Sequence, residues 1–284
     1  MPTPTANALA FSLVIPAFNE AARLPAFLAA ATAHLRDLYP GSFEILVVDD
    51  GSTDATGALA ARAGTPVRLL PLPMNQGKGA AVRAGMLAAR GGLRLFADAD
   101  GATPIGEVTR LVRALDAGHD IAIGSRVGHA GRRVWVRAAE AVPAAAPPVS
   151  APPVWHVRRH RHYAGRAFAA LVRGVVGSPF ADTQCGFKLF RAAAADALFP
   201  LVRCRGWAFD VEVLALAARA GQRVTEVPVS WHETAGSRMH LGRDALQMAS
   251  ALWPIRRRTR ISFTARVRVP VVAARAAPRS RKAG

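Results

Sequence analysis

The stretches FSLVIPAFNE at residues 11–20 and FEILVVDDGSTD at residues 43–54 decide the expected fold. Each begins as a short apolar run of strand length and ends in polar residues that favour a turn. Longer segments with helical spacing follow each of them, so strands and helices alternate through the first 125 residues. Such alternation is typical of an α/β protein with a Rossmann-like, mostly parallel sheet flanked by helices.

The alternation of apolar runs and helical spacing predicts the secondary structure along the whole chain. We expect strands at about 11–16, 43–49, 67–71, 93–97, 120–124 and 223–229. We expect helices at about 20–36, 54–64, 78–90, 104–117, 164–176, 191–202, 209–220 and 242–253. Residues 180–190 are interpreted as a loop that carries a motif, and residues 128–163, rich in Pro, Ala and Arg, as an insertion or loop. Residues 1–240 then form one domain, and residues 241–284 a C-terminal helix and a basic tail.

Charge points to a polyanionic partner. The chain of 284 residues has 37 Lys and Arg against 19 Asp and Glu, a formal charge of +18, and at 51% hydrophobic it can bury a real core. The first 120 residues are nearly balanced, whereas ten basic residues and no acid follow from Arg256 to the end. The candidates are nucleic acid, anionic lipid and phosphorylated substrates.

Neither the N-terminus nor any apolar run predicts a membrane span. The start of the chain lacks the basic region and cleavage site of a signal peptide. Charged residues interrupt every apolar run before it reaches the ~18–20 residues that a span needs. Cys185 and Cys204 form no C-x-x-C pair, so we expect reduced thiols in a cytoplasmic protein.

Four strand ends carry polar or glycine-rich motifs. These follow the strands at residues 16–20 (PAFNE), 49–54 (DDGSTD), 75–79 (NQGKG) and 98–100 (DAD). Open α/β sheets bind ligands at the carboxyl ends of their strands, so we expect one crevice there. Asp98 and Asp100 can converge on one hard cation, Mg²⁺ or Mn²⁺, which prefers oxygen ligands and commonly bridges carboxylates to a diphosphate. Taken alone, two aspartates of this spacing are more often solvated turn residues.

Taken in order and spacing, these motifs carry a resemblance. IPAFNE, VVDDGSTD, NQGKGAAVRAG and FADADGATP resemble the family 2 glycosyltransferases, which have a GT-A fold. More narrowly, DADGATP, GSR, DTQCGFKLF and GWAFDVEVL resemble the dolichyl-phosphate, or polyprenyl-phosphate, β-glucosyltransferases. The likeness covers roughly residues 11–127 and 164–240. It implies inverting transfer of a hexose, glucose from UDP-glucose, to a polyprenyl phosphate. Independently of the resemblance, the basic clusters and the basic tail predict peripheral attachment to an anionic membrane surface, on the cytoplasmic side.

The resemblance also assigns roles to particular residues. It implies that Asp98 and Asp100 hold the metal and that Arg126, Asp182 and Lys188 act with them in catalysis. The acceptor side would be formed by Arg126, Gln184 and Lys188. The nucleotide would be bound by Pro16, Glu20, Asp49, Asp50, Lys78, Asp98, Ser237 and Arg238. Ala102 stands where related mannosyltransferases carry a further metal-ligating Gln, which favours the glucosyl branch.

Two other classes of nucleotide-binding protein need residues that this sequence lacks. A P-loop would need Ser or Thr where Gly79 follows Lys78, and a nicotinamide-binding loop would need glycine at Val82. A nucleic-acid-binding protein fits the basic clusters but lacks a recognisable binding motif, so we expect no nucleic acid partner. A nucleotidyltransferase, a GDP-mannose-dependent mannosyltransferase and a family 2 enzyme with a hydroxyl acceptor stay open, and the sequence does not give the oligomeric state.

Overall fold

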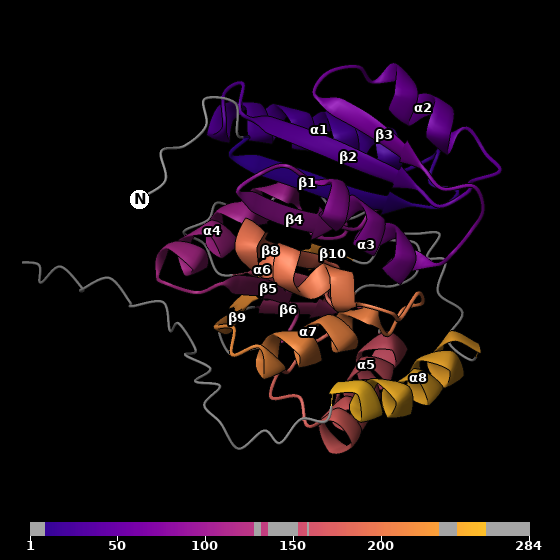
Figure 1. The fold of residues 1–284 in the computed structure, drawn as a ribbon, viewed down its shortest axis with the longest axis vertical. Helices are drawn as coiled ribbons and strands as arrows, with labels where there is room; N and C mark the ends of the chain where they lie inside the picture. Colours follow the sequence, from indigo (N-terminus) through magenta and orange to yellow (C-terminus); the bar gives the residue numbers. More distant parts are fainter. Residues whose placement is uncertain (1–8, 128–131, 136–152, 158, 233–242, 260–284) are drawn as a thin grey trace, which may run out of the picture.

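The computed structural model describes residues 9–127, 132–135, 153–157, 159–232 and 243–259. In this part of the chain, a seven-stranded sheet with the order β3-β2-β1-β4-β8-β5-β9 runs through the centre (Figure 1). All its strands are parallel except β8, which is antiparallel to both of its neighbours. The strands are β1 Phe11–Ala17, β2 Phe43–Asp49, β3 Val67–Pro71, β4 Leu93–Ala97, β5 Ile121–Ser125, β8 Phe187–Arg191 and β9 Val224–Pro228. The predicted mostly parallel α/β sheet is therefore confirmed.

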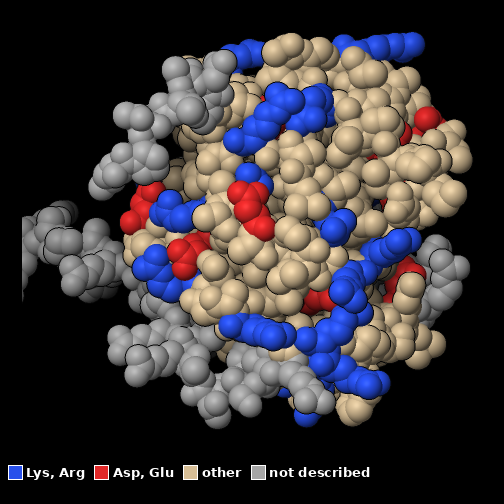
Figure 2. All heavy atoms as spheres, viewed as in Figure 1, with Lys and Arg blue, Asp and Glu red and all other residues tan. Residues whose placement is uncertain are grey.

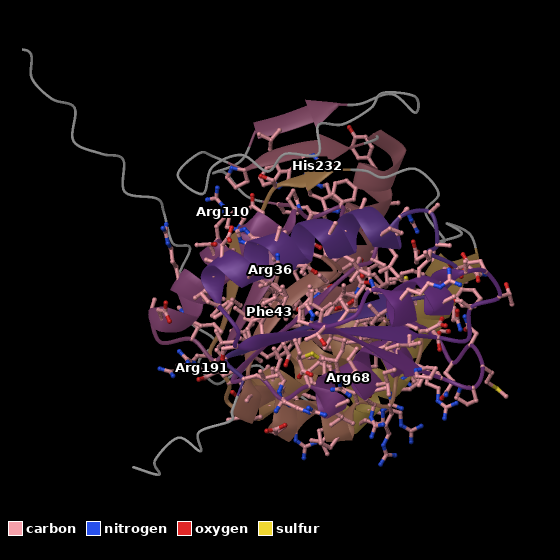
Figure 3. All side chains as sticks on the ribbon, turned by 90° about the horizontal axis from the view of Figure 1, so that it is seen from above. Arg36, Phe43, Arg68, Arg110, Arg191 and His232 are labelled. Atoms are coloured by element: carbon pink, nitrogen blue, oxygen red, sulfur yellow. The ribbon has the colours of Figure 1, made fainter. Side chains whose placement is uncertain are left out.

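Helices cover both faces of this sheet because successive strand residues point to opposite sides. On β1, Leu13 and Ile15 pack against one layer, and Val14 packs against the other. The first layer is formed by α1 Leu24–Leu38, α2 Thr56–Arg62 and α4 Val108–Asp116, preceded by the short helix η1 Ile105–Glu107. The second is formed by α3 Lys78–Ala88, α6 Ala192–Leu198, η2 Phe199–Leu201 and α7 Phe209–Arg219. Both layers are visible in the view from above (Figure 3).

The prediction of a loop over residues 180–190 is wrong for the second half of this segment. Residues Phe187–Arg191 form β8, which lies between β4 and β5 in the centre of the sheet. Phe187 and Leu189 pack into one layer, and Phe190 packs into the other. The apolar alternation around Lys188 is thus a strand signal, and the lysine occupies a fully buried strand position.

The interval expected to be a loop or insertion contributes to a second, three-stranded sheet. Its strands β6 Arg132–Trp135 and β7 Val154–Val157 pair with each other, and β7 pairs with β10 Trp231–His232. The indole Nε1 of Trp155 donates to the carbonyl of Val229, and the amide of His232 donates to the carbonyl of Ala102. These bonds join the small sheet to the segment after β9 and to the turn after β4, and Figure 3 labels His232 at this place.

Two further helices, α5 Arg159–Val176 and α8 Arg243–Thr259, pack against α7. Val172 and Val176 of α5 meet Met248, Leu252 and Ile255 of α8 in a third apolar cluster. Both helices occur where the sequence predicted helices, and both are longer than expected. Among the described helices, none combines the length and the apolar character needed to cross a bilayer.

Candidate active site

A cavity of about 1250 Å³ lies at the carboxyl ends of β1, β2, β4 and β5. It extends between α5 and α8, whose inner residues contribute to its wall. Of the residues proposed from sequence, the cavity is lined by Pro16, Glu20, Asp50, Lys78, Asp98, Asp100, Arg126, Asp182 and Gln184. Two others, Asp49 and Lys188, are not part of its lining, and Ser237 and Arg238 lie outside the described residues.

Asp98 forms an ion pair with a lysine of the neighbouring loop. The ammonium Nζ of Lys78, at the start of α3, lies 2.6 Å from Oδ1 of Asp98. Burial alone would lower the pKa of Lys78, but Asp98, with Asp210, raises it, so the lysine stays charged. On the other side, a Cβ at Gly186 would lie 2.0 Å from Oδ2 of Asp98. Only glycine at position 186 therefore leaves the aspartate room in this position.

Asp100 lies beside a second ion pair that sequence reasoning missed. Arg23 binds both carboxylate oxygens of Glu20, and its Nη1 lies 3.8 Å from Oδ2 of Asp100. Oδ1 of Asp100 accepts a hydrogen bond of 3.0 Å from the amide of Ala102, which closes the turn. The i, i+3 spacing of Glu20 and Arg23 was the available signal. The guanidinium of Arg23 thus lies between the carboxylates of Glu20 and Asp100.

The two aspartates after β2 have different positions. Both oxygens of Asp50 accept backbone hydrogen bonds of 2.8 Å, from Gln76 and Gly77, so Asp50 holds the third motif loop against the second. Burial raises the pKa of Asp50, and these two hydrogen bonds oppose that rise. Asp49 accepts from the amide of Ser52 at 3.0 Å and closes its own turn. Asp49 is not part of the cavity lining, and its contact with a nucleotide stays a prediction.

Arg126 forms a bidentate ion pair with Asp182. Its Nε and Nη2 donate to the two oxygens of Asp182 at 2.7 and 2.8 Å, and its backbone amide donates to Oδ2 at 2.9 Å. Burial alone would raise the pKa of Asp182, but Arg126 lowers it below its ordinary value. The carboxylate of Glu226 fixes the loop by accepting from the amides of Ala181 and Asp182. The two guanidinium donors expected to bind phosphate therefore already have a carboxylate partner.

Lys188 supports the cavity from behind. Its ammonium is completely buried and donates at 2.6 Å both to Oδ1 of Asp210 and to the carbonyl of Cys185. Asp210, at the start of α7, does line the cavity. Burial raises the pKa of Asp210, and Lys188 and Lys78 oppose that rise. Asp210 is thus the functional candidate that sequence reasoning passed over, and its place in the first turn of a helix was the signal.

Two neighbouring residues have clearer roles in the structure than in the sequence. The Nε2 atom of Gln184 is buried and, within the described part of the chain, lacks a hydrogen-bond partner. Such a donor on a cavity wall is suited to an oxygen of a ligand. Burial raises the pKa of the Cys185 thiol to about 12, so it stays a thiol and is no nucleophile.

The acidic turn fits a hard divalent cation that is shared with a substrate. The side chains of Asp98 and Asp100 are 35% and 23% exposed and lie on one cavity wall. No group of three or more His, Cys, Asp or Glu side chains converges among the described residues. Mg²⁺ typically binds through one or two carboxylates and completes its shell with water and substrate phosphates. Two carboxylates on an open cavity match that requirement.

Comparison with known proteins identifies the family. The sequence model of glycosyl transferase family 2 matches residues 12–199. The chain belongs to this family. Among its relatives, the dolichyl-phosphate β-glucosyltransferase of Saccharomyces cerevisiae is 36% identical over 86% of this chain and 73% of its own. The enzymes of the same name from Drosophila melanogaster and Homo sapiens are 37% and 33% identical, each over 87% of this chain and 74% and 75% of their own.

Solved structures confirm that this glycosyltransferase has the GT-A fold. Glucosyl-3-phosphoglycerate synthase from Mycobacterium tuberculosis in complex with UDP has a TM-score of 0.62, at 20% identity over 87% of this chain and 80% of its own. Mannosyl-3-phosphoglycerate synthase from Rubrobacter xylanophilus has a TM-score of 0.60, at 19% identity over 89% of this chain and 74% of its own. At these identities the likeness concerns the fold.

Proposed function

We propose that this glycosyltransferase transfers glucose from UDP-glucose to the phosphate of a polyprenyl carrier such as dolichyl phosphate, with inversion at the sugar. The observation that carries the proposal is one cavity that joins two kinds of wall. One wall is the acidic turn of Asp98 and Asp100, and the other is α5 and α8. The relatives named dolichyl-phosphate β-glucosyltransferase, which align with most of the chain, support this substrate pair.

The donor would lie over the carboxyl ends of β1, β2 and β4. Pro16, Glu20, Asp50 and Lys78 line this side of the cavity and are its proposed nucleotide contacts. A divalent cation, Mg²⁺ or Mn²⁺, held there by Asp98 and Asp100, would neutralise the charge that grows on the leaving diphosphate. Lys78 is charged and lies next to Asp98, so it adds a fixed positive charge beside the proposed cation site.

The acceptor side would be formed by Arg126, Asp182, Gln184 and Asp210. The Arg126–Asp182 pair fixes the loop before β8, and the unpartnered Nε2 of Gln184 can donate to a sugar or phosphate oxygen. Lys188 is a positioning residue, because its buried ammonium holds Asp210 at the cavity wall. A phosphate acceptor is already ionised at neutral pH, so the reaction needs no strong general base.

The protein would work at a membrane surface, since the proposed acceptor is a lipid, and the free thiols of Cys185 and Cys204 favour the reducing, cytoplasmic side. A donor and acceptor assay tests the reaction. The protein is incubated in detergent with radiolabelled UDP-glucose or GDP-mannose and a short-chain prenyl phosphate, with EDTA and after Mg²⁺ or Mn²⁺ is restored. We expect a metal-dependent glucosyl lipid in the organic phase and release of UDP. Preference for GDP-mannose would overturn the donor, and release of pyrophosphate would indicate a nucleotidyltransferase.

Asp210 favours a second candidate, transfer to a hydroxyl acceptor. A buried carboxylate with a raised pKa on the cavity wall is suited to act as a general base. One substitution distinguishes the two candidate functions. Asp210→Asn should abolish transfer to a hydroxyl acceptor, whereas a prenyl phosphate, which carries its own negative charge, should retain measurable turnover.

A further inference from the structure

The outward face of α5 is apolar along most of its length. Val172 and Val176 are buried on one side of this helix. The opposite side, at positions i, i+4 and i+11, carries Tyr163, Ala167 and Gly174, all of them exposed. A helix that faces water normally carries charged or polar residues there. We define the outward face of α5 by these three residues together with Leu171, which is 41% exposed.

Helix α8 repeats the pattern with larger side chains. Met248, Leu252 and Ile255 are buried against α5 and α7. Leu246 and Trp253 are seven residues apart, so they share one side of the helix. They are 75% and 62% exposed, so this side faces away from α5 and α7. Four of the nine large apolar side chains exposed in the described chain lie on these two helices, namely Tyr163, Leu171, Leu246 and Trp253. Apolar exposure of this density, surrounded by polar residues, marks an interaction surface.

The charges around this surface have one sign. Arg166 and Arg173 are exposed residues of α5 that also line the cavity, and Arg256 and Arg257 lie near the end of α8. Asp244 is the one acid in the sequence of either helix, and it is buried. Figure 2 shows Lys and Arg side chains gathered over the end of the molecule where α5 and α8 lie in Figure 1. The pair thus offers apolar side chains within a positive field.

The two helices are held as a unit and border the cavity. Nη1 of Arg256 donates to the carbonyl of Val175 at 2.8 Å, and Nη2 of Arg258 donates to Glu212 of α7 at 2.8 Å. Inner residues of both helices, such as Phe168 and Met248, line the cavity wall. A partner on the outward face would therefore lie directly beside the cavity mouth.

We propose that the outward face of the α5–α8 pair docks on an anionic lipid bilayer, with Leu246 and Trp253 entering the interfacial region and Arg256 and Arg257 meeting lipid phosphates. Tryptophan favours this region because its ring is apolar and its N–H is polar. Basic residues near the surface add electrostatic attraction to anionic headgroups. The inference rests on the proposed function, since a lipid acceptor must pass from the bilayer to the cavity.

A sedimentation assay with matched variants tests the proposal. The full chain is mixed with phosphatidylcholine vesicles that contain or lack phosphatidylglycerol, without substrates. The docking variant combines Leu246→Asp with Trp253→Asp. The control combines Met74→Asp with Leu201→Asp, at side chains that are 67% and 57% exposed elsewhere on the molecule. We expect binding to anionic vesicles to fall at least about tenfold in the docking variant and to stay within about twofold in the control.

Each contrary outcome has a distinct meaning. Equal losses in both variants, or unchanged binding in the docking variant, would overturn the proposal. Loss of binding only after deletion of residues 260–284 would assign docking to the basic tail. If the docking variant instead changes the oligomeric state in light scattering and still binds vesicles, the face is an interface between two copies. The transfer assay in detergent with a short-chain prenyl phosphate should be unaffected by the docking variant, so failure of the proposed function is measured separately.

Discussion

The donor and acceptor sides of the cavity hold their carboxylates differently. On the donor side, Asp100 and Asp98 are partly exposed on a turn, and one carboxylate oxygen of Asp100 closes that turn by a backbone hydrogen bond. On the acceptor side, Asp182 and Asp210 are almost completely buried, and each is matched by a cation from a distant part of the chain. An exposed turn carboxylate contributes to chemistry with little effect on stability, whereas a buried ion pair contributes to both.

The largest expected effect tests the acceptor side through Lys188→Met. This change leaves Asp210 in a buried place without its ammonium partner, and removing one member of a buried pair costs about 3–5 kcal/mol. Urea unfolding should therefore show a large loss in the free energy of unfolding. In Lys188→Met/Asp210→Asn, where no buried charge is left, part of the loss should return. A loss below about 1 kcal/mol in the single variant would mean that the pair is not tightly coupled.

Asp100→Asn tests the donor side. The substitution keeps the shape of the turn and removes the negative charge needed for a cation, so kcat should fall by about 10²–10³. The melting temperature should stay within a degree or two of that of the parent, because the side chain is 23% exposed and lies outside the core. Asp116→Asn, at an exposed carboxylate at the end of α4, is the control. A large fall in stability would erase the contrast between the two sides.

A smaller effect on kcat is expected at Gly186, where the loop before β8 contacts Asp98. A Cβ at Gly186 would collide with the carboxylate of Asp98, so Gly186→Ala should displace this side chain. Misplacement of a reacting group by about 1 Å can cost on the order of 10² in rate, and we expect a fall in kcat between about 10-fold and 10². Gly174→Ala, where a Cβ would meet open space, should leave kcat unchanged. Equal activity in both variants would show that Asp98 tolerates the displacement.

The smallest effect concerns acid. The folded state lowers the pKa of Asp182, so this group contributes stability above its ordinary pKa of 3.8 that is lost as the pH falls through the lower, folded value. The free energy of unfolding should thus decline in acid, and Asp182→Asn should flatten that decline. Asp120 also has a lowered pKa, through its hydrogen bond with Arg223, but that pair lies in solvent. Asp120→Asn should therefore flatten the curve less, and the reverse order would contradict the contrast.

The same contrast explains what the sequence could predict. Each donor-side motif lies within a few residues after an apolar strand, so Asp50, Lys78, Asp98 and Asp100 could be brought together by the rule for parallel sheets. Acceptor-side partners are set by tertiary packing. The residues of the Arg126–Asp182 pair lie 56 positions apart, and no local pattern joins them.

Lys188 shows why a local reading failed. Residues 180–190 were predicted to form a loop that carries a motif, yet β8 places this lysine inside the sheet, where Asp210 of α7 compensates its charge. Asp49 and Asp50 differ for a related reason, because adjacent strand-end residues point to opposite sides and, of the two, Asp50 lines the cavity. The order of the motifs was therefore predictable, but the direction of individual side chains was not.

The central place of β8 also sets an order of events during synthesis. β4 and β5 leave the ribosome before β8, and in the described sheet they are joined only through it. Until Phe187–Arg191 emerge, the nascent chain carries an open edge at β4 and a strand β5 without its place in the sheet. Open edges pair readily with other chains. During the interval between these strands the growing chain therefore exposes an edge that is prone to aggregation, and a product cut short before β8 would retain that edge.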